Sequence, residues 1–278
     1  MRDDFIALAG HAHNRYRGLD LRQLLLGCVV ALATLLGSVS AAQAEHHARV
    51  TTLFLAGDST MAPKLPEKRP ETGWGEALEA QADPSVIAIS NHARNGRSTR
   101  TFISEGRWQA ILDALHPGDW VMIQFGHNDA SEQKIDRYTP PDQYRANLSR
   151  FVTEVRERGG QPILLTPVMR RRFDEQGNFY DTHGRYAQIV RAVAEADAAT
   201  LVDMHALSGA LLLTLGEDHS RDLFLILPPG KFDNYPAGLD DNTHFSPAGA
   251  EIMANLVMNE LRRQKLPLAS LLDAEPAH

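Results

Sequence analysis

Asp241 and His244 have the residue types and the spacing that general-base chemistry needs. A carboxylate three residues before a histidine can turn back and accept a hydrogen bond from one ring nitrogen, so that the other nitrogen accepts a proton. Asp113 and His116 show the same spacing, but they stand just before an apolar run, whereas ligands of an α/β protein bind beyond the strand ends. The sequence therefore favours His244 as the proton acceptor.

Three further polar blocks carry groups that could act on a substrate. Ser59 could lie near a helix N-terminus, where backbone amides stabilise negative charge, although an Asp/Ser helix cap is an equally good interpretation. Gly96 could bring its N–H close to a ligand, or could simply form a turn. Asn128 could donate its amide to an oxyanion, or could belong to a polar turn. His92 and His127 lie in the same blocks and are rival bases.

The elements that must position these residues alternate between strands and helices. Short runs rich in Val, Ile, Leu or Phe predict buried strands at 51–56, 86–90, 120–125, 163–166 and 201–204. Amphipathic spacing predicts helices at 102–115, 144–158, 186–198 and 248–263. This alternation indicates a parallel sheet with helices on both faces, and 228–238 is expected to be a loop within the domain.

Each polar block follows a predicted strand or precedes the last helix. In an open parallel sheet, ligands bind beyond the carboxyl ends of the strands, so the blocks are expected to meet at one edge. Ser246 as N-cap and Pro247 at the first helical position would start the last helix. We therefore expect His244 on the loop just before that helix.

Residues 1–44 have the pattern of a signal peptide. A 13-residue apolar run at 24–36 follows three arginines and precedes the small-Xaa-small site at 42–44. The run is short for a membrane span, and a buried helix is the alternative. We expect residues 45–278 to form a single exported domain, periplasmic or extracellular, without a membrane partner and with a loose tail after about residue 266.

Composition excludes several functions for that domain. The 278-residue chain is 43% hydrophobic and 23% charged, as in globular proteins. Its formal net charge of −7, or −8 once the leader is removed, argues against a general nucleic-acid binder. Cys28, the only cysteine, lies in the leader, which excludes thiol catalysis and cysteine-bound metals from the remainder. The sequence also has no HExxH motif, Walker-type loop or dinucleotide fingerprint.

Taken together, the four blocks resemble the SGNH hydrolases, also called GDSL-like esterases. They read Gly-Asp-Ser-Thr at 57–60, Asn-Gly-Arg-Ser at 95–98, Gly-His-Asn-Asp at 126–129 and Asp-Asn-Thr-His-Phe at 241–245. Thr60 departs from the family pattern, in which leucine is common. Gly-Trp-Gly at 73–75 and Gln-Phe before the third block are similar to the rhamnogalacturonan acetylesterase branch. The resemblance covers about residues 51–260.

This resemblance implies a fold, a set of roles and an activity. The implied fold is an α/β three-layer αβα sandwich, flavodoxin-like, with a five-stranded parallel sheet. Ser59 would be the nucleophile, His244 the base and Asp241 its orienting partner. The oxyanion donors would be the Ser59 and Gly96 N–H groups and the Asn128 side chain. No metal or organic cofactor is implied.

The activity implied is a secreted carbohydrate esterase that deacetylates plant cell-wall polysaccharide. Acetylated rhamnogalacturonan, a pectin, is the leading substrate, and acetylated xylan is the rival polymer. A lipase or thioesterase on the same scaffold would need an apolar acyl groove, and a non-catalytic carbohydrate-binding domain would be favoured by loss of a triad residue. All three triad residues are present.

Arginines gather in two loops of the predicted ligand edge. They are Arg94, Arg97, Arg100, Arg170, Arg171 and Arg172. Guanidinium groups match carboxylates through paired hydrogen bonds, so Arg97, Arg170 and Arg171 are candidates to bind the uronates of pectin. The alternative is that these arginines pair with local carboxylates or stay solvated.

Overall fold

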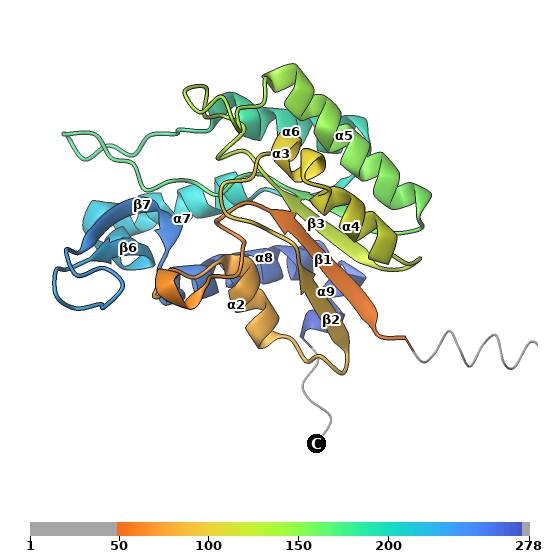
Figure 1. Cartoon of the computed structure of the whole chain (residues 1–278), viewed down its shortest axis with the longest axis horizontal. Coiled ribbons are helices and arrows are strands. Elements are labelled where there is room, and N and C mark those ends of the chain that lie inside the picture. Colours follow the sequence, from red (N-terminus) through yellow and green to blue (C-terminus); the bar gives the residue numbers. More distant parts are fainter. Residues whose placement is uncertain (1–48, 274–278) are drawn as a thin grey trace, which may run out of the picture. The chain divides into compact units, whose positions relative to one another are not determined.

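The computed structural model describes residues 49–273, and a five-stranded parallel sheet forms their centre (Figure 1). Its strands run in the order β2-β1-β3-β4-β5. Every neighbouring pair is parallel, as the continuous apolar runs predict. The bounds are β1 Thr51–Gly57, β2 Ile87–Asn91, β3 Trp120–Gln124, β4 Gln161–Leu165 and β5 Thr200–Val202.

Helices cover both faces of this sheet, which confirms the three-layer αβα architecture (Figure 1). Side chains alternate along each strand, so Leu53 and Leu55 pack into one core and Phe54 into the other. The first core is covered by α2 (Trp74–Gln81), α7 (Met204–His219), α8 (Pro247–Arg263) and α9 (Pro267–Leu272). The second is covered by α3 (Thr99–Ser104), α4 (Arg107–Ala114), α5 (Pro141–Glu157) and α6 (Gly184–Ala196).

Two predicted boundaries are wrong for local reasons. The helix expected at 102–115 is two helices, because Gly106 adopts φ 71° between α3 and α4. The strand expected at 201–204 ends at Val202, because the Asp203 side chain accepts from the Ala206 N–H and caps α7.

The segment after residue 266 is ordered to the end of the described residues, so the expected loose tail is wrong there. It forms α9, whose Leu268 and Leu272 are buried against α8 and the first core. Burial of these leucines supplies the stabilisation that a six-residue helix lacks on its own.

A two-stranded antiparallel hairpin carries Asp241 and His244. It consists of β6 (Phe224–Leu227) and β7 (Leu239–Phe245), joined by the loop expected at 228–238. The predicted N-cap Ser246 and the first-turn Pro247 of α8 are confirmed, since the Gly249 N–H donates to Ser246 Oγ. His244 nevertheless lies on β7 rather than on a loop, because 239–245 pairs with β6.

The strand order creates one edge where the polar blocks meet. After β1 the chain builds β2 on one side and then crosses to β3 on the other, so a crevice opens beyond the carboxyl ends of β1 and β3. Among residues 49–273, no helix is long and apolar enough to cross a bilayer. The predicted signal peptide, residues 1–44, lies outside the described residues.

Candidate active site

Ser59 lies on a tight turn directly beyond the carboxyl end of β1. The carbonyl oxygen of Asp58 accepts from the Met61 and Ala62 N–H groups, at 3.3 and 3.0 Å. The buried Asp58 carboxylate accepts from the N–H and the hydroxyl of Thr60, both at 2.9 Å. Ser59 caps no helix, because the next helical segment along the described chain, the 3₁₀ turn Pro66–Lys68, begins seven residues later. The helix-cap interpretation of Ser59 is therefore wrong.

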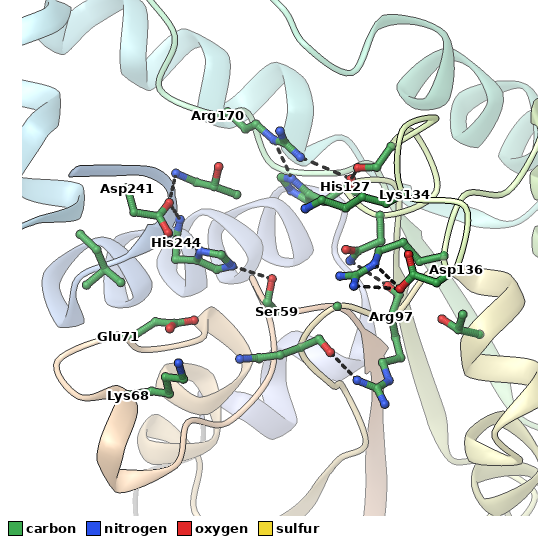
Figure 2. Close-up of a pocket in the computed structure, with 18 of the residues that line it drawn as sticks. Ser59, Lys68, Glu71, Arg97, His127, Lys134, Asp136, Arg170, Asp241 and His244 are labelled. Carbon is green, nitrogen blue, oxygen red and sulfur yellow. Dashed lines mark hydrogen bonds and ion pairs between the residues drawn. The ribbon is translucent and has the colours of Figure 1, made fainter. Parts of the chain in front are cut away.

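Ser59, His244 and Asp241 form a chain of two hydrogen bonds (Figure 2). His244 Nε2 lies 2.8 Å from Ser59 Oγ, and His244 Nδ1 lies 2.7 Å from Asp241 Oδ2. The carboxylate only accepts, so Nδ1 carries a proton toward it and Nε2 is left to accept the serine proton. The arrangement can deprotonate a hydroxyl as that hydroxyl attacks an electrophile.

Asp241 is held in its ionised form. Partial burial acts to raise its pKa, but the His244 ring and the backbone N–H groups of His244 and Thr243 outweigh that effect and lower the pKa to about 2. Those two N–H groups donate to Asp241 Oδ1 at 3.1 and 2.8 Å. The carboxylate therefore stays charged through the range in which imidazole titrates.

The two rival histidines make other contacts. His92 Nε2 lies 3.0 Å from the hydroxyl of Ser90 on β2. His127 is buried, with Nδ1 lying 3.0 Å from His183 Nε2 and accepting from Arg170 Nε at 3.3 Å. Burial lowers the pKa of His127 well below its usual range, and the charges of Arg170 and His244 add to the lowering. Among the described residues, only His244 is hydrogen-bonded to Ser59 Oγ.

The three residues predicted to supply oxyanion donors, Ser59, Gly96 and Asn128, all line one pocket. Gly96 has φ 78°, a conformation that favours glycine. Within residues 49–273, neither the Gly96 N–H nor the Ser59 N–H meets an acceptor, so both are available to a ligand. Asn128 Nδ2 donates to the Arg97 carbonyl oxygen at 3.0 Å and keeps a second N–H for the pocket.

We expect Asn128→Ala to lower kcat for an aryl acetate by roughly 10²–10³-fold, because the donor serves charge that develops in the transition state. KM should change little. Steady-state kinetics with a chromogenic acetate measures both constants. A rise in KM with kcat unchanged would show instead that Asn128 holds the ground-state substrate.

The pocket of about 840 Å³ is lined mainly by polar and charged side chains (Figure 2). Leu225 and Leu239 are its aliphatic lining residues. Arg97 and Arg137 each pair with a carboxylate of the same lining, Glu105 and Asp136 respectively. The remaining lining cations are Lys68, Lys134 and Arg170.

One predicted ligand-binding arginine is wrongly placed. Arg97 and Arg170 line the pocket, but the buried Arg171 does not. Its guanidinium donates to the Glu217 carbonyl oxygen, the Ser220 hydroxyl and Asn242 Oδ1, the last at 2.7 Å. Arg171 therefore stabilises β7 through its bond to Asn242 and does not reach the pocket.

The sequence pattern missed several residues of the site. Lys64, Glu71 and Asn95 lie around Ser59, and Lys134 extends into the pocket toward His127 (Figure 2). No motif or spacing rule identifies them; the contact between Lys64 and Asn95, for example, joins residues 31 positions apart. Within the described part of the chain, no group of three or more His, Cys, Asp or Glu residues is arranged to hold a metal ion.

Comparisons with known proteins show the family of this chain. Residues 55–252 match the model of the GDSL-like Lipase/Acylhydrolase family. The rhamnogalacturonan acetylesterase RhgT of Bacillus subtilis (strain 168) is 38% identical over 216 residues, covering 78% of this chain and 91% of its own. The probable rhamnogalacturonan acetylesterase YesY of the same organism is 36% identical over 224 residues, covering 80% and 98%.

Solved structures show the same fold. The YXIM protein of Bacillus subtilis superposes with a TM-score of 0.67 at 27% identity, over 79% of this chain and 58% of that one. The acetylxylan esterase Axe2 of Geobacillus stearothermophilus superposes with a TM-score of 0.55 at 24% identity, over 81% and 95%. The resemblance to the SGNH hydrolase fold is thereby confirmed.

Proposed function

The chain belongs to the GDSL-like lipase/acylhydrolase family and is a carboxylic-ester hydrolase, and we propose that it deacetylates a carbohydrate through an acetyl-serine intermediate. The hydrogen-bonded chain from Ser59 through His244 to Asp241, open to the pocket, is the observation that carries this proposal. The relatives named rhamnogalacturonan acetylesterases support the substrate class.

In the first half of the proposed reaction, Ser59 Oγ attacks the acetyl carbonyl carbon while His244 Nε2 takes its proton. The carbonyl oxygen becomes an oxyanion that receives hydrogen bonds from Ser59 N, Gly96 N and Asn128 Nδ2. As the carbonyl re-forms, the bond to the sugar oxygen breaks, and His244 returns the proton to that oxygen. The sugar alcohol leaves and an acetyl-Ser59 ester remains.

In the second half, water takes the place of the sugar alcohol. His244 removes a proton from this water as it attacks the acetyl carbonyl, and the same donors hold the second oxyanion. Acetate leaves, and His244 returns the proton to Ser59. Every proton transfer uses one histidine, so the site needs no other acid or base.

The lining supports a small acyl group on a bulky polar alcohol. Among residues 49–273, Leu225 and Leu239 are the aliphatic residues that line the pocket, which is too little apolar surface to hold a long acyl chain. A lipase would need an apolar groove for its acyl chain, whereas an acetyl group needs none. The charged rim suits a polar polymer instead.

Acetate release from polymers tests this function. We expect a higher kcat/KM for acetylated rhamnogalacturonan than for acetylated xylan, and aryl-ester rates that fall as the acyl chain lengthens beyond acetyl. Rates that rise with acyl length would support a lipase or thioesterase. Aryl acetate turnover without acetate release from either polymer would overturn the carbohydrate proposal.

Within this function, we propose that Arg170 and Lys134 recognise uronate carboxylates. Arg170 Nε and Nη2 donate to uncharged acceptors of His127, both at 3.3 Å, so its charge is not offset there by a direct carboxylate partner. Among residues 49–273, the Lys134 ammonium contacts no carboxylate within ion-pair distance. The opposite charges on substrate and rim would attract, as in other carboxylate-binding sites.

This proposal predicts a salt effect that depends on the polymer. Raising salt to 1 M shortens the Debye length to about 3 Å, so KM for acetylated pectin should rise while KM for neutral acetylated xylan stays constant. Arg170→Gln and Lys134→Gln should each raise the pectin KM. Arg94→Gln is the matched control, since Arg94 is exposed and outside the pocket lining. Equal salt responses on the two polymers would remove the reason to propose a uronate site.

We further propose that the chain is exported, on the pattern of its first 44 residues. The apolar run at 24–36 and the site at 42–44 support cleavage after Ala44. N-terminal sequencing of protein recovered outside the cytoplasm should begin at Glu45, and an intact leader on that protein would contradict cleavage.

A further inference from the structure

Lys64 places a buried ammonium group behind the nucleophile. It follows Ser59 by five residues, and its side chain has an exposed fraction of 0%. The ammonium donates hydrogen bonds to the Ser59 carbonyl oxygen and to Asn95 Oδ1 at 2.9 Å, and it forms an ion pair with Glu71 Oε1 at 2.7 Å. Lysine is almost never fully buried unless its charge is paired. The Glu71 carboxylate supplies that pairing.

Each oxyanion loop fixes its own donor. The Asp58 carbonyl belongs to the same peptide group as the Ser59 N–H, and its bonds to Met61 N and Ala62 N fix that plane. The Asn95 carbonyl likewise shares a peptide group with the Gly96 N–H, and Arg97 Nη1 donates to it at 2.8 Å. These local bonds orient each N–H within its loop, but they do not set the distance between the two loops.

Lys64 joins the two loops through its side chain, in addition to the backbone hydrogen bond from the Arg94 N–H to the Gly57 carbonyl oxygen at 3.0 Å. Its ammonium binds the peptide carbonyl on the C-terminal side of Ser59 and, at the same time, the side chain of the residue before Gly96. Burial acts to lower the pKa of Lys64, while the Glu71 carboxylate opposes that lowering. Because Glu71 balances the charge, the effect of Lys64 on the oxyanion is one of position.

We propose that Lys64 is a positioning residue for the oxyanion hole, which sets the spacing of the Ser59 and Gly96 N–H donors by bridging their loops. The proposal rests on the role of Ser59 as nucleophile given under the proposed function. A hole that is mis-spaced by about 1 Å costs on the order of 10²-fold in rate. That loss falls on the transition state, since the planar ester of the ground state does not need both donors.

The test uses the full chain with an aryl acetate, and an organophosphate that inactivates serine hydrolases as second probe. Lys64→Met should lower kcat on the order of 10²-fold with KM within about two-fold of the parent. Inactivation by the organophosphate should slow by a similar factor, because its phosphoryl oxygen occupies the same hole. Lys64→Gln, which keeps neutral donors, should recover part of the rate.

Asn95→Ala provides a second variant in case Lys64→Met does not fold. Asn95 is a half-buried loop residue, and its change to alanine removes the bond from Lys64 Nζ to Asn95 Oδ1. The Lys64–Glu71 ion pair stays in place. Because both changes cut the same bridge, the kcat loss of Lys64→Gln combined with Asn95→Ala should be well below the product of the separate losses.

Arg156→Met is the matched control for loss of a cation that binds carbonyl oxygens. Arg156 donates to the Asp197 and Ala198 carbonyls, far from Ser59 in the chain and outside the pocket lining. It should change Tm without changing kcat. Lys64 variants with unchanged kcat, with a loss confined to KM, or with a loss equal to their unfolded fraction would overturn the proposal. Ser59→Ala assayed in parallel separates this failure from failure of the serine mechanism itself.

Discussion

Ser59→Ala should lower kcat for an aryl acetate on the order of 10⁶-fold, the loss seen when serine proteases lose their nucleophile. The alanine enzyme keeps the oxyanion donors but has no oxygen with which to form an acyl intermediate. Folding should be preserved, because within residues 49–273 the hydroxyl bonds only to His244 Nε2, while the turn is held by backbone atoms and Asp58.

Three measurements check this expectation. Steady-state rates give the loss, thermal melting shows whether the fold is kept, and mass spectrometry of the quenched parent enzyme should find the acyl group on the peptide that contains Ser59. Ser131→Ala is the matched control from the same pocket lining, since within residues 49–273 the Ser131 hydroxyl bonds only to the His127 carbonyl oxygen. This change should lower kcat at most a few-fold. A Ser59→Ala enzyme that kept a tenth of the parental kcat would contradict the assignment.

The meeting of Ser59, Gly96 and Asn128 could be predicted because strand direction determines it. Buried parallel strands are continuous apolar runs, so β1, β2 and β3 are readable from sequence, and residues that follow them share one edge of the sheet. The structure brings these three residues into one pocket. The order and direction of the strands were sufficient for this prediction, and no side-chain contact had to be known.

The placement of His244 could only be predicted in part. The local spacing of Asp241 and His244 identified their hydrogen bond, because three residues suffice for the ring to reach the carboxylate. The strand that carries them pairs with β6, and the sequence from 239 to 245 lacks the apolar alternation that marks a strand. Contacts from distant parts of the chain hold that strand in place; one of them is the hydrogen bond from the Thr72 N–H to the Phe245 carbonyl oxygen.

Arg171 and Lys64 show why the charged residues could not be assigned from sequence. Cation clusters near a ligand edge are equally consistent with substrate binding and with internal bracing, and burial decides between them. Arg171 reaches Asn242, 71 positions away, and Lys64 reaches Asn95, 31 positions away. Long, flexible side chains take their partners from the tertiary fold, so local patterns carry little information about them.

The second-largest expected effect is at Asp241. Asp241→Asn should lower kcat by up to about 10⁴-fold, since an amide can stabilise the wrong tautomer of His244 and leaves the imidazolium uncompensated. The Thr243 and His244 N–H groups can still donate to the remaining carbonyl oxygen, so the end of β7 should keep its shape. Kinetics with an aryl acetate, together with thermal melting, separate lost chemistry from lost structure.

The pH profile of the parent enzyme follows from the same pair. A protonated imidazole has no lone pair for the Ser59 proton, so kcat/KM should fall as pH falls, with the slope of one proton. The pKa of Asp241 is lowered to about 2, so loss of the Asp241 charge does not produce this limb. His244→Ala should cost more than His127→Ala, whose ring is bonded to His183 instead of Ser59. The opposite order would move the base to the loop after β3.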